Sequence, residues 1–180
     1  MMRTSSGFAL RFPVTLAVAG MVAVAVPKGG LGAPSENLAC TLLTEADAAE
    51  IMGGKVESTS RDENKEYGHA SCGYSFVGFK SVTLNVWRLK TEQEGVRRLQ
   101  SVEKDSKADF KEQMNIDVTV RRIEGLGSSA VWVFTEGEEP RISQLDVVKG
   151  RYRLLTNVFG VSDTLGISKK LAQRVLAKLP

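Results

Sequence analysis

Four segments with strand-like alternation follow one another between residues 118 and 159, and this run constrains the fold more than any other feature of the chain. The alternation of apolar and polar residues predicts strands at 118–123, 129–135, 142–149 and 152–159. Lys149-Gly150-Arg151 predicts a tight turn between the last two. Strands joined by such short connections pair antiparallel, so we expect an antiparallel sheet in this part of the chain.

Helices are predicted on both sides of this run of strands. Thr44 and Thr91 each stand three residues before an acid, Asp47 and Glu94 respectively, which is the spacing of a capping box at a helix start. A stripe of leucine and valine residues predicts a last helix at 168–179.

Two further strands, at 71–76 and 82–89, precede the second helix, so strands followed by a helix occur twice along the chain. Residues 58–68 are polar and predict a loop or a weak hairpin arm. The sequence therefore predicts an α+β fold with a single antiparallel β-sheet and helices mainly on one face. The repetition also suggests two βββα-like halves.

The first 33 residues have the order of a signal peptide. Arg3 and Arg11 lead into the apolar run Phe12–Val26, and small residues follow it. The run has about 15 residues, which is short for a bilayer span. The sequence therefore predicts a secreted or periplasmic protein, and no later apolar segment predicts a transmembrane helix in the mature chain.

Cleavage is expected near Ala25 or Ala33, which leaves residues 34–180 as a single α+β domain. The whole chain has 24 basic and 21 acidic residues. Three of the bases and none of the acids lie in the first 33 residues, so the charges of the rest are balanced. A nucleic-acid binder usually needs a surplus of positive charge, and we expect no nucleic-acid partner.

Cys40 and Cys72 are the two cysteines of the chain, and both lie beyond the signal segment. In an oxidising compartment this predicts one disulfide, closing a loop that the chain-entropy model values at roughly 3–4 kcal/mol. As an alternative, Asn37-Leu38-Ala39-Cys40 partly resembles a lipobox, which would make Cys40 a lipid-anchored N-terminus. Two cysteines and one histidine lack the ligand count of a metal site, so we expect no metal and no cofactor.

No motif in the sequence predicts a catalytic residue. Residues 125–130 match the G-x-G-x-x-A fingerprint, but the residues after them are strand-like where a dinucleotide fold needs a helix. His69 is the only histidine, and a set with Ser71 and a distant Asp stays open, although we expect strand neighbours to face opposite ways. The acids at 136, 138 and 139 share one loop and predict a solvated turn rather than a pair across a cleft.

A ligand or partner surface is predicted on the strands. Its candidate residues are Tyr74, Trp87, Trp132, Tyr152 and Arg153. If these residues share the sheet face that the helices leave open, they form an aromatic platform with Arg88, Arg121 and Asp146 at its polar edges. The competing interpretation places the aromatic side chains in the core, which is the more common position for a tryptophan on a strand.

These motifs together resemble a loose group of small secreted bacterial proteins and lipoproteins of unknown function. The matching segments are Cys40-Thr41-Leu42-Leu43-Thr44-Glu45-Ala46-Asp47-Ala48, Cys72-Gly73-Tyr74, Gly125-Leu126-Gly127-Ser128-Ser129-Ala130-Val131-Trp132, Lys149-Gly150 and Leu171-Ala172. The resemblance implies a Cys40–Cys72 disulfide and a single α+β domain, and it supplies no catalytic residues. Ser128 stands where the group often has Asp.

The sequence thus favours a secreted or periplasmic, non-enzymatic module that binds a protein or a small ligand on an open sheet face. One alternative is an inhibitor or regulatory partner of a secreted hydrolase, because a disulfide-linked sheet offers a rigid surface. The other is a hydrolase of unfamiliar type that uses His69. An acid–base pair in a deep pocket would favour the enzyme, and a flat exposed face would favour the binding module.

Overall fold

The computed structural model describes residues 37–136 and 142–180. The predicted signal peptide and the acids at 138 and 139 lie outside these residues. The described helices are α1 (Leu38–Leu42), α2 (Glu45–Met52), α3 (Glu92–Met114) and α4 (Thr164–Lys178). The described strands are β1 (Val56–Asn64), β2 (His69–Phe76), β3 (Lys80–Arg88), β4 (Thr119–Arg122), β5 (Ser129–Phe134), β6 (Ser143–Lys149) and β7 (Tyr152–Phe159).

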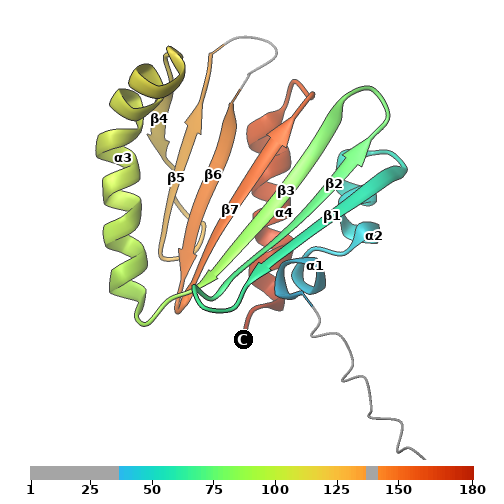
Figure 1. Cartoon of the computed structure of the whole chain (residues 1–180), viewed down its shortest axis with the longest axis horizontal. Coiled ribbons are helices and arrows are strands. Elements are labelled where there is room, and N and C mark those ends of the chain that lie inside the picture. The colour runs from blue at the N-terminus through green and yellow to red at the C-terminus, as the bar shows by residue number, and fades with distance from the viewer. Residues whose placement is uncertain (1–36, 137–141) are drawn as a thin grey trace, which may run out of the picture. The chain divides into compact units, whose positions relative to one another are not determined.

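The described strands form one seven-stranded sheet in the order β1-β2-β3-β7-β6-β5-β4, with every neighbouring pair antiparallel (Figure 1). The predicted α+β fold with a single sheet is therefore confirmed. The first half has three strands and a helix, as predicted, whereas the second half has four strands before its helix. The halves meet where β3 pairs with β7, from Ser81 opposite Phe159 to Arg88 opposite Tyr152.

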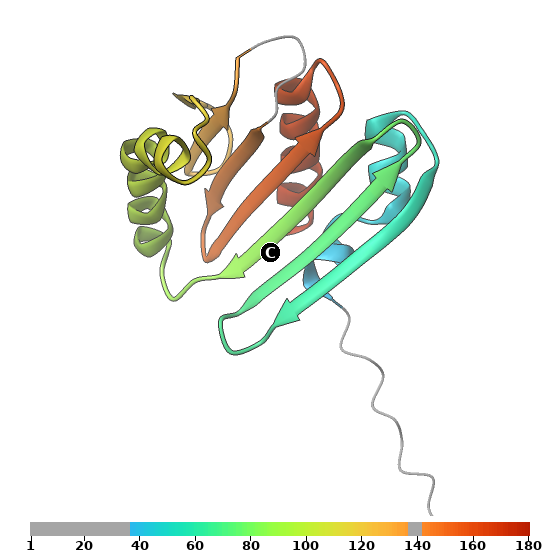
Figure 2. The same cartoon turned by 45° about the horizontal axis from the view of Figure 1, so that its top comes forward.

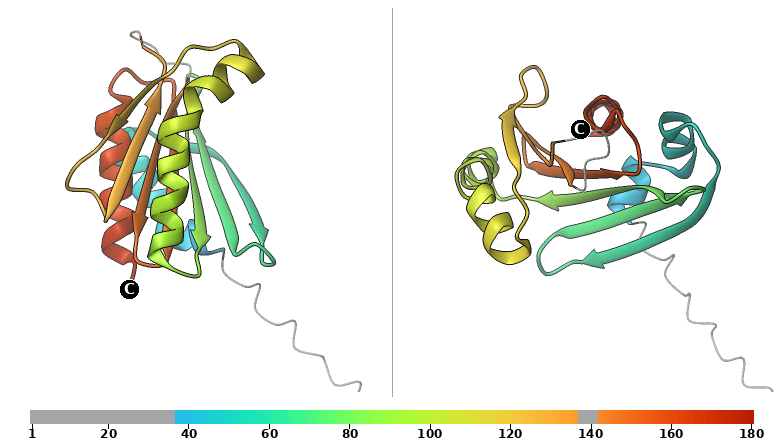
Figure 3. Two further views of the ribbon diagram at one scale, coloured as in Figure 1. Left: turned by 90° about the vertical axis from the view of Figure 1, so that its left-hand side faces the viewer. Right: turned by 90° about the horizontal axis from the view of Figure 1, so that it is seen from above.

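The described helices lie on both faces of the sheet: α1, α2 and α4 share one face, and α3 lies on the other (Figure 3). Helix α1 packs on β2 and β3, α4 packs on β6 and β7, and α2 lies beside α4. Helix α3 lies on the opposite face, over β4, β5 and β6. The face that carries α1, α2 and α4 is called the covered face below. The part of the other face that α3 leaves bare, over β1, β2, β3 and β7, is called the open face (Figures 1 and 2).

The main core lies between the covered face and its three helices. Alternate residues of the central strands point into it, including Val82, Leu84 and Val86 of β3, all of them fully buried. Leu171 and Val175 of α4 meet them with the apolar stripe that the sequence predicts. Burial of about 25 cal/mol per Å² of apolar surface makes this layer the main source of stability.

A smaller core lies under α3. Leu99 of the helix is fully buried against Val131, Val133 and Val148 of the sheet. Gly95 permits this close packing, because a Cβ atom there would lie only 2.6 Å from the Leu89 Cδ1 atom.

The predicted disulfide between Cys40 and Cys72 is present, and it joins α1 to β2 on the covered face. The polar residues 58–64 belong to β1, an edge strand that is exposed beyond Val56, so the weak hairpin arm is a full strand. The charged side chains on this edge strand, such as Arg61 and Asp62, disfavour its pairing with another chain. At Thr44 the reciprocal capping box is complete, whereas at Thr91 only the threonine side chain accepts from the helix.

Candidate functional site

The open face carries mostly polar side chains, arranged in rows across the strands. Residues directly opposite one another on paired strands point to the same face, so the register defines the rows. Three rows cross β1, β2, β3 and β7 in that order. The first, near the end of β3 that leads to α3, is Asn64, His69, Trp87 and Arg153. The second is Asp62, Ser71, Asn85 and Leu155, and the third is Ser60, Gly73, Thr83 and Asn157. Hydroxyl, amide and imidazole groups thus replace the apolar residues found on the covered face.

An ion pair marks the border between the open face and the part that α3 covers. Arg153 of β7 donates to Asp146 of β6 through Nε, at 3.0 Å from Oδ1, and through Nη2, at 2.5 Å from Oδ2. The Asp146 side chain is 3% exposed and that of Arg153 is 16% exposed. Burial raises the pKa of Asp146, and the Arg153 guanidinium opposes that shift. The two-pronged contact fixes the position of the guanidinium on the face.

Trp87 stands between two neighbours that occupy both sides of its ring. His69 of β2 stacks on it with 4.8 Å between the ring centroids. Arg153 of β7 places its guanidinium carbon 4.9 Å from the ring centroid on the other side. Such cation–π and stacking contacts hold all three side chains in place, but they leave only the edge of the indole for a partner.

His69 contacts Asn85 and Trp87. Its Nε2 atom lies 3.2 Å from the Asn85 Oδ1 atom. Ser71 is two residues from His69 and shares its face, so the expectation that they face opposite ways is wrong. No hydrogen bond joins His69 to Ser71 or to an acid within the described ranges. His69 is therefore placed as part of the polar row, and the hydrolase interpretation gains no geometric support.

A shallow hollow of about 200 Å³ lies at the far end of the open face, between β3, β7 and β6. Thr83, Gln144 and Asn157 are among its lining residues. The Asn157 Oδ1 atom is buried and accepts no hydrogen bond within the described part of the chain. A buried acceptor without a donor is costly, so this atom favours a ligand group or a water that donates to it.

Three of the five residues predicted for the surface lie on the covered face instead. Tyr74 is 3% exposed, and its hydroxyl donates to the Leu43 carbonyl at 2.6 Å. Trp132 is 8% exposed, and its Nε1 donates to the Ser143 hydroxyl at 3.1 Å. Tyr152 packs against the edge of the main core. The platform of several aromatic residues is therefore wrong, and Trp87 and Arg153 are the predicted residues that the open face does carry.

Of the predicted polar edges, Asp146 borders the open face and the two arginines do not. Arg88 pairs with Tyr152 and belongs to the covered side of the sheet. Arg121 pairs with Trp132, and its guanidinium carbon lies 5.1 Å from the Phe134 ring centroid, also on the covered side. Four further residues of this face were not predicted from the sequence: Thr83, Asn85, Gln144 and Asn157. The period of two along each strand places them on the face of Trp87 and Arg153, but only the strand register shows that they adjoin.

The glycine-rich segment at 125–130 is a turn that leads into β5, as expected from its strand-like continuation. Ser128 donates to the Val148 carbonyl through both its backbone N–H, at 2.7 Å, and its hydroxyl, at 3.0 Å. Gly127 has a φ of +64° and packs against the backbone of β6, where a side chain would collide. No helix opens at this turn, so the geometry that holds a pyrophosphate is not formed here.

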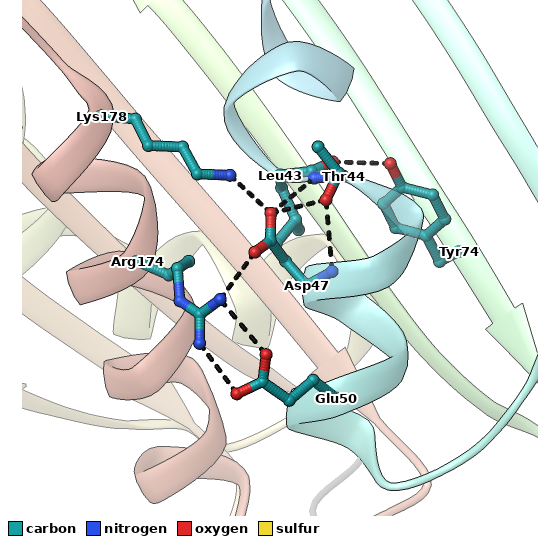
Figure 4. Close-up of polar contacts among 7 residues, drawn as sticks. All are labelled: Leu43, Thr44, Asp47, Glu50, Tyr74, Arg174 and Lys178. Carbon is teal, nitrogen blue, oxygen red and sulfur yellow. Dashed lines mark hydrogen bonds and ion pairs between the residues drawn. The ribbon is translucent and has the colours of Figure 1, made fainter.

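On the covered side, one polar network ties α2 to α4 (Figure 4). Asp47 caps its own helix at Thr44 and accepts from Arg174 at 2.7 Å and from Lys178 at 2.5 Å. Glu50 binds the other side of the Arg174 guanidinium. Burial by itself would raise the pKa of Asp47, but the hydrogen bonds from Lys178, Thr44 and Arg174 outweigh it and hold that pKa well below its usual range. This network is a clamp between helices rather than a binding site.

The fold and the open face define a class: a disulfide-linked α+β domain with three helices on one sheet face and a partly bare opposite face. Within residues 37–136 and 142–180, no three His, Cys, Asp or Glu side chains are grouped to hold a metal ion. The described helices also include none with the length and apolar content to cross a bilayer. No protein-family model matches the chain, and a comparison with curated proteins gave no match.

Proposed function

We propose that this protein is a secreted or periplasmic, non-enzymatic module that binds a protein partner on the open face of its sheet. The observation that carries the proposal is the bare half-sheet, whose side chains are held in position by contacts with one another. Asp146, Arg153, Trp87, His69 and Asn85 form one connected series across four strands. The disulfide supports an oxidising compartment.

The size of the face favours a protein over a small ligand. Strands of eight to nine residues give the four strands of the open face, β1, β2, β3 and β7, a plan area of about 500 Å². That is more than half of the roughly 800 Å² that one partner contributes to a standard interface, so the face can form the larger part of one. The hollow on this face has about 200 Å³, less than the roughly 300–1,000 Å³ of small-molecule pockets.

Preorganisation supports the same proposal. The Arg153 guanidinium is fixed by Asp146 and Trp87, so little side-chain entropy is lost when a partner binds it. Arginine and tryptophan are also the residues that contribute most often to the energy of protein interfaces. The surrounding serine, threonine and asparagine side chains supply donors and acceptors for a polar rim.

The test is affinity capture with oxidised protein comprising residues 34–180, from envelope and culture-fluid extract, read by mass spectrometry. Ser71→Arg places a long cationic side chain in the middle of the open face, where the serine hydroxyl makes no hydrogen bond to a described residue. Gln173→Arg adds the same group on the exposed side of α4. The wild type and Gln173→Arg are expected to capture one stoichiometric partner. Ser71→Arg is expected to capture about tenfold less of that partner, or less still.

Two results would contradict the proposal. One is a partner that Ser71→Arg retains as well as the wild type does, which would move the binding surface elsewhere. The other is the absence of any stoichiometric protein in the wild-type capture. Circular dichroism of each variant, with an unchanged thermal midpoint, separates loss of binding from loss of folding.

A further inference from the structure

A second surface, distinct from the open face, has the features of a binding pocket. It lies at the end of the sheet where β3 stops and the β6–β7 turn begins, and it has a volume of about 590 Å³. Arg88, Leu89, Lys149, Arg151 and Tyr152 are among its lining residues. This volume falls within the range of pockets that hold small molecules.

The strand register sets two cations on either side of an aromatic ring. Tyr152 of β7 lies directly opposite Arg88 of β3 on one side and directly opposite Lys149 of β6 on the other. These three side chains therefore point to the same side of the sheet, which is the covered side. Tyr152 is partly buried against the main core, so its ring is held as a wall of the pocket.

The three basic side chains keep most of their hydrogen-bonding capacity free. Arg88 makes no side-chain hydrogen bond to a described residue. Arg151 donates through Nε to the Leu89 carbonyl at 3.2 Å, which leaves both of its terminal nitrogens available. Lys149 donates one hydrogen bond from Nζ to the Leu176 carbonyl at 2.9 Å and keeps two donors.

No acidic side chain is among the described residues that line this pocket, which also include Pro180. Within the part of the chain that the structure describes, Arg88, Lys149 and Arg151 form no ion pair with an acid. Glu92 contacts the turn, but its carboxylate accepts from the backbone N–H of Gly150 rather than from a basic side chain. Exposed lysines and arginines are ordinarily solvated singly on a surface. Three that line one hollow with an aromatic wall repel one another, and an anion in the hollow would relieve that repulsion.

We propose that this pocket binds a small organic anion, with a carboxylate or phosphate head group and an apolar body. The Arg88 and Arg151 guanidinium groups would bind the head group through paired N–H donors, as arginine forks bind planar or tetrahedral oxyanions. The apolar body would lie against the Tyr152 ring and Leu89. The site is independent of the open face, so either can be occupied without the other.

The test is calorimetric titration of the oxidised protein with phenyl phosphate and with benzoate, beside inorganic phosphate and phenol as the two partial ligands. We expect one organic anion to bind saturably at one equivalent, and the better of the two identifies the head group. Inorganic phosphate and phenol are expected to bind about tenfold more weakly, because phosphate lacks the apolar body and phenol lacks the anionic head group. If neither organic anion saturates the protein at up to about 10 mM, the proposal is overturned.

Single substitutions locate the site. Arg88→Gln removes a cation whose side chain makes no hydrogen bond to a described residue, so it should leave the thermal midpoint unchanged and weaken binding about fivefold or more. Arg88→Lys should restore part of the affinity. Lys104→Gln removes one positive charge from the exposed side of α3 and should change the affinity less than about twofold. Equal losses in Lys104→Gln and Arg88→Gln would show general charge attraction and overturn the pocket assignment.

Discussion

The two faces of the sheet are built from the same strands, yet they carry opposite chemistry. The covered face presents alternating apolar residues to three helices, and nearly all of these residues are buried. The opposite face is apolar under α3, whereas beyond β6 its rows carry mostly polar side chains, together with Trp87 and Leu155. One face therefore supplies most of the stability, and the other is free to carry polar groups. If this division is correct, equivalent substitutions on the two faces must lower the free energy of unfolding by very different amounts.

Truncation of the buried tryptophan should have the largest effect. Trp132 stacks on Phe134 with 3.6 Å between ring centroids and donates to Ser143 on the covered face. Trp132→Ala should lower the free energy of unfolding by about 3–5 kcal/mol, because it leaves a cavity in the main core. Urea unfolding monitored by circular dichroism measures the loss. A cost below about 1 kcal/mol would show that the covered face is not the main core.

Removal of the disulfide should lower the free energy of unfolding slightly less than Trp132→Ala does. Cys40 and Cys72 are separated by 32 positions, and the bond fixes α1 on the covered face. The double change Cys40→Ala and Cys72→Ala should reduce stability by about 3–4 kcal/mol, mainly because the unfolded chain is no longer constrained. The urea midpoint of this variant should equal that of the reduced wild type. A large difference between the two would mean that the alanine side chains themselves disturb the packing.

The clamp between α2 and α4 predicts a dependence on acid pH. The pKa of Asp47 is held well below its usual range in the folded state. The ionised carboxylate therefore stabilises the folded protein fully at pH values above the pKa of the unfolded carboxyl, about 3.9, and this contribution declines as the pH falls below that value. Asp47→Asn should cost about 1–2 kcal/mol at pH 7 through lost capping and ion pairing. The difference from the wild type should shrink as unfolding is measured at pH values approaching 2. Glu50→Gln is the control, since Glu50 is exposed and, among the described residues, pairs only with Arg174. A difference between Asp47→Asn and the wild type that stays constant across pH would refute the assignment to Asp47.

Local patterns in the sequence predicted the elements of the sheet well. The strand 152–159 was predicted with its observed bounds, and Thr44 and Thr91 cap α2 and α3 as expected. These features depend on neighbouring residues alone. The length of α3 was not predicted, because residues 103–113 are charged and have only Phe110 as a large apolar residue. The helix continues because Phe110 packs on the small core and Glu103 pairs with Arg122 of β4.

The site was predicted only in part, since alternation does not say which face of a strand will be covered. In β5 the even-numbered Trp132 points toward α4, and in β3 the odd-numbered Trp87 points away from it. That choice depends on the pairing of strands far apart in the sequence and on where the helices pack. The row that joins Trp87 to Arg153 and His69 exists only in the folded register.

The contact between α3 and the sheet should respond to a single methyl group. A Cβ atom at Gly95 would lie 2.6 Å from Leu89 Cδ1 and 2.9 Å from both Val148 methyl groups. Gly95→Ala should therefore cost about 1–3 kcal/mol in overpacking, offset by roughly 1 kcal/mol of helix propensity, for a net loss of about 1 kcal/mol. Ser101→Ala, on the exposed side of α3, should be neutral or slightly stabilising. If Gly95→Ala is also stabilising, α3 is not packed closely against the small core.

Truncation of Trp87, the half-buried tryptophan of the open face, should have the smallest effect on folding. Trp87→Ala removes the stacking with His69 and the cation–π contact with Arg153, but it leaves the Arg153–Asp146 ion pair in place. The expected loss is about 1 kcal/mol in urea unfolding, several times smaller than for Trp132→Ala. If the open face binds a partner, the same variant should weaken that binding by more than it weakens the fold, because Arg153 is then no longer held in position. Equal unfolding costs for the two tryptophans would remove the distinction between the faces. A normal partner affinity in the folded Trp87→Ala protein would instead place the binding surface away from this row.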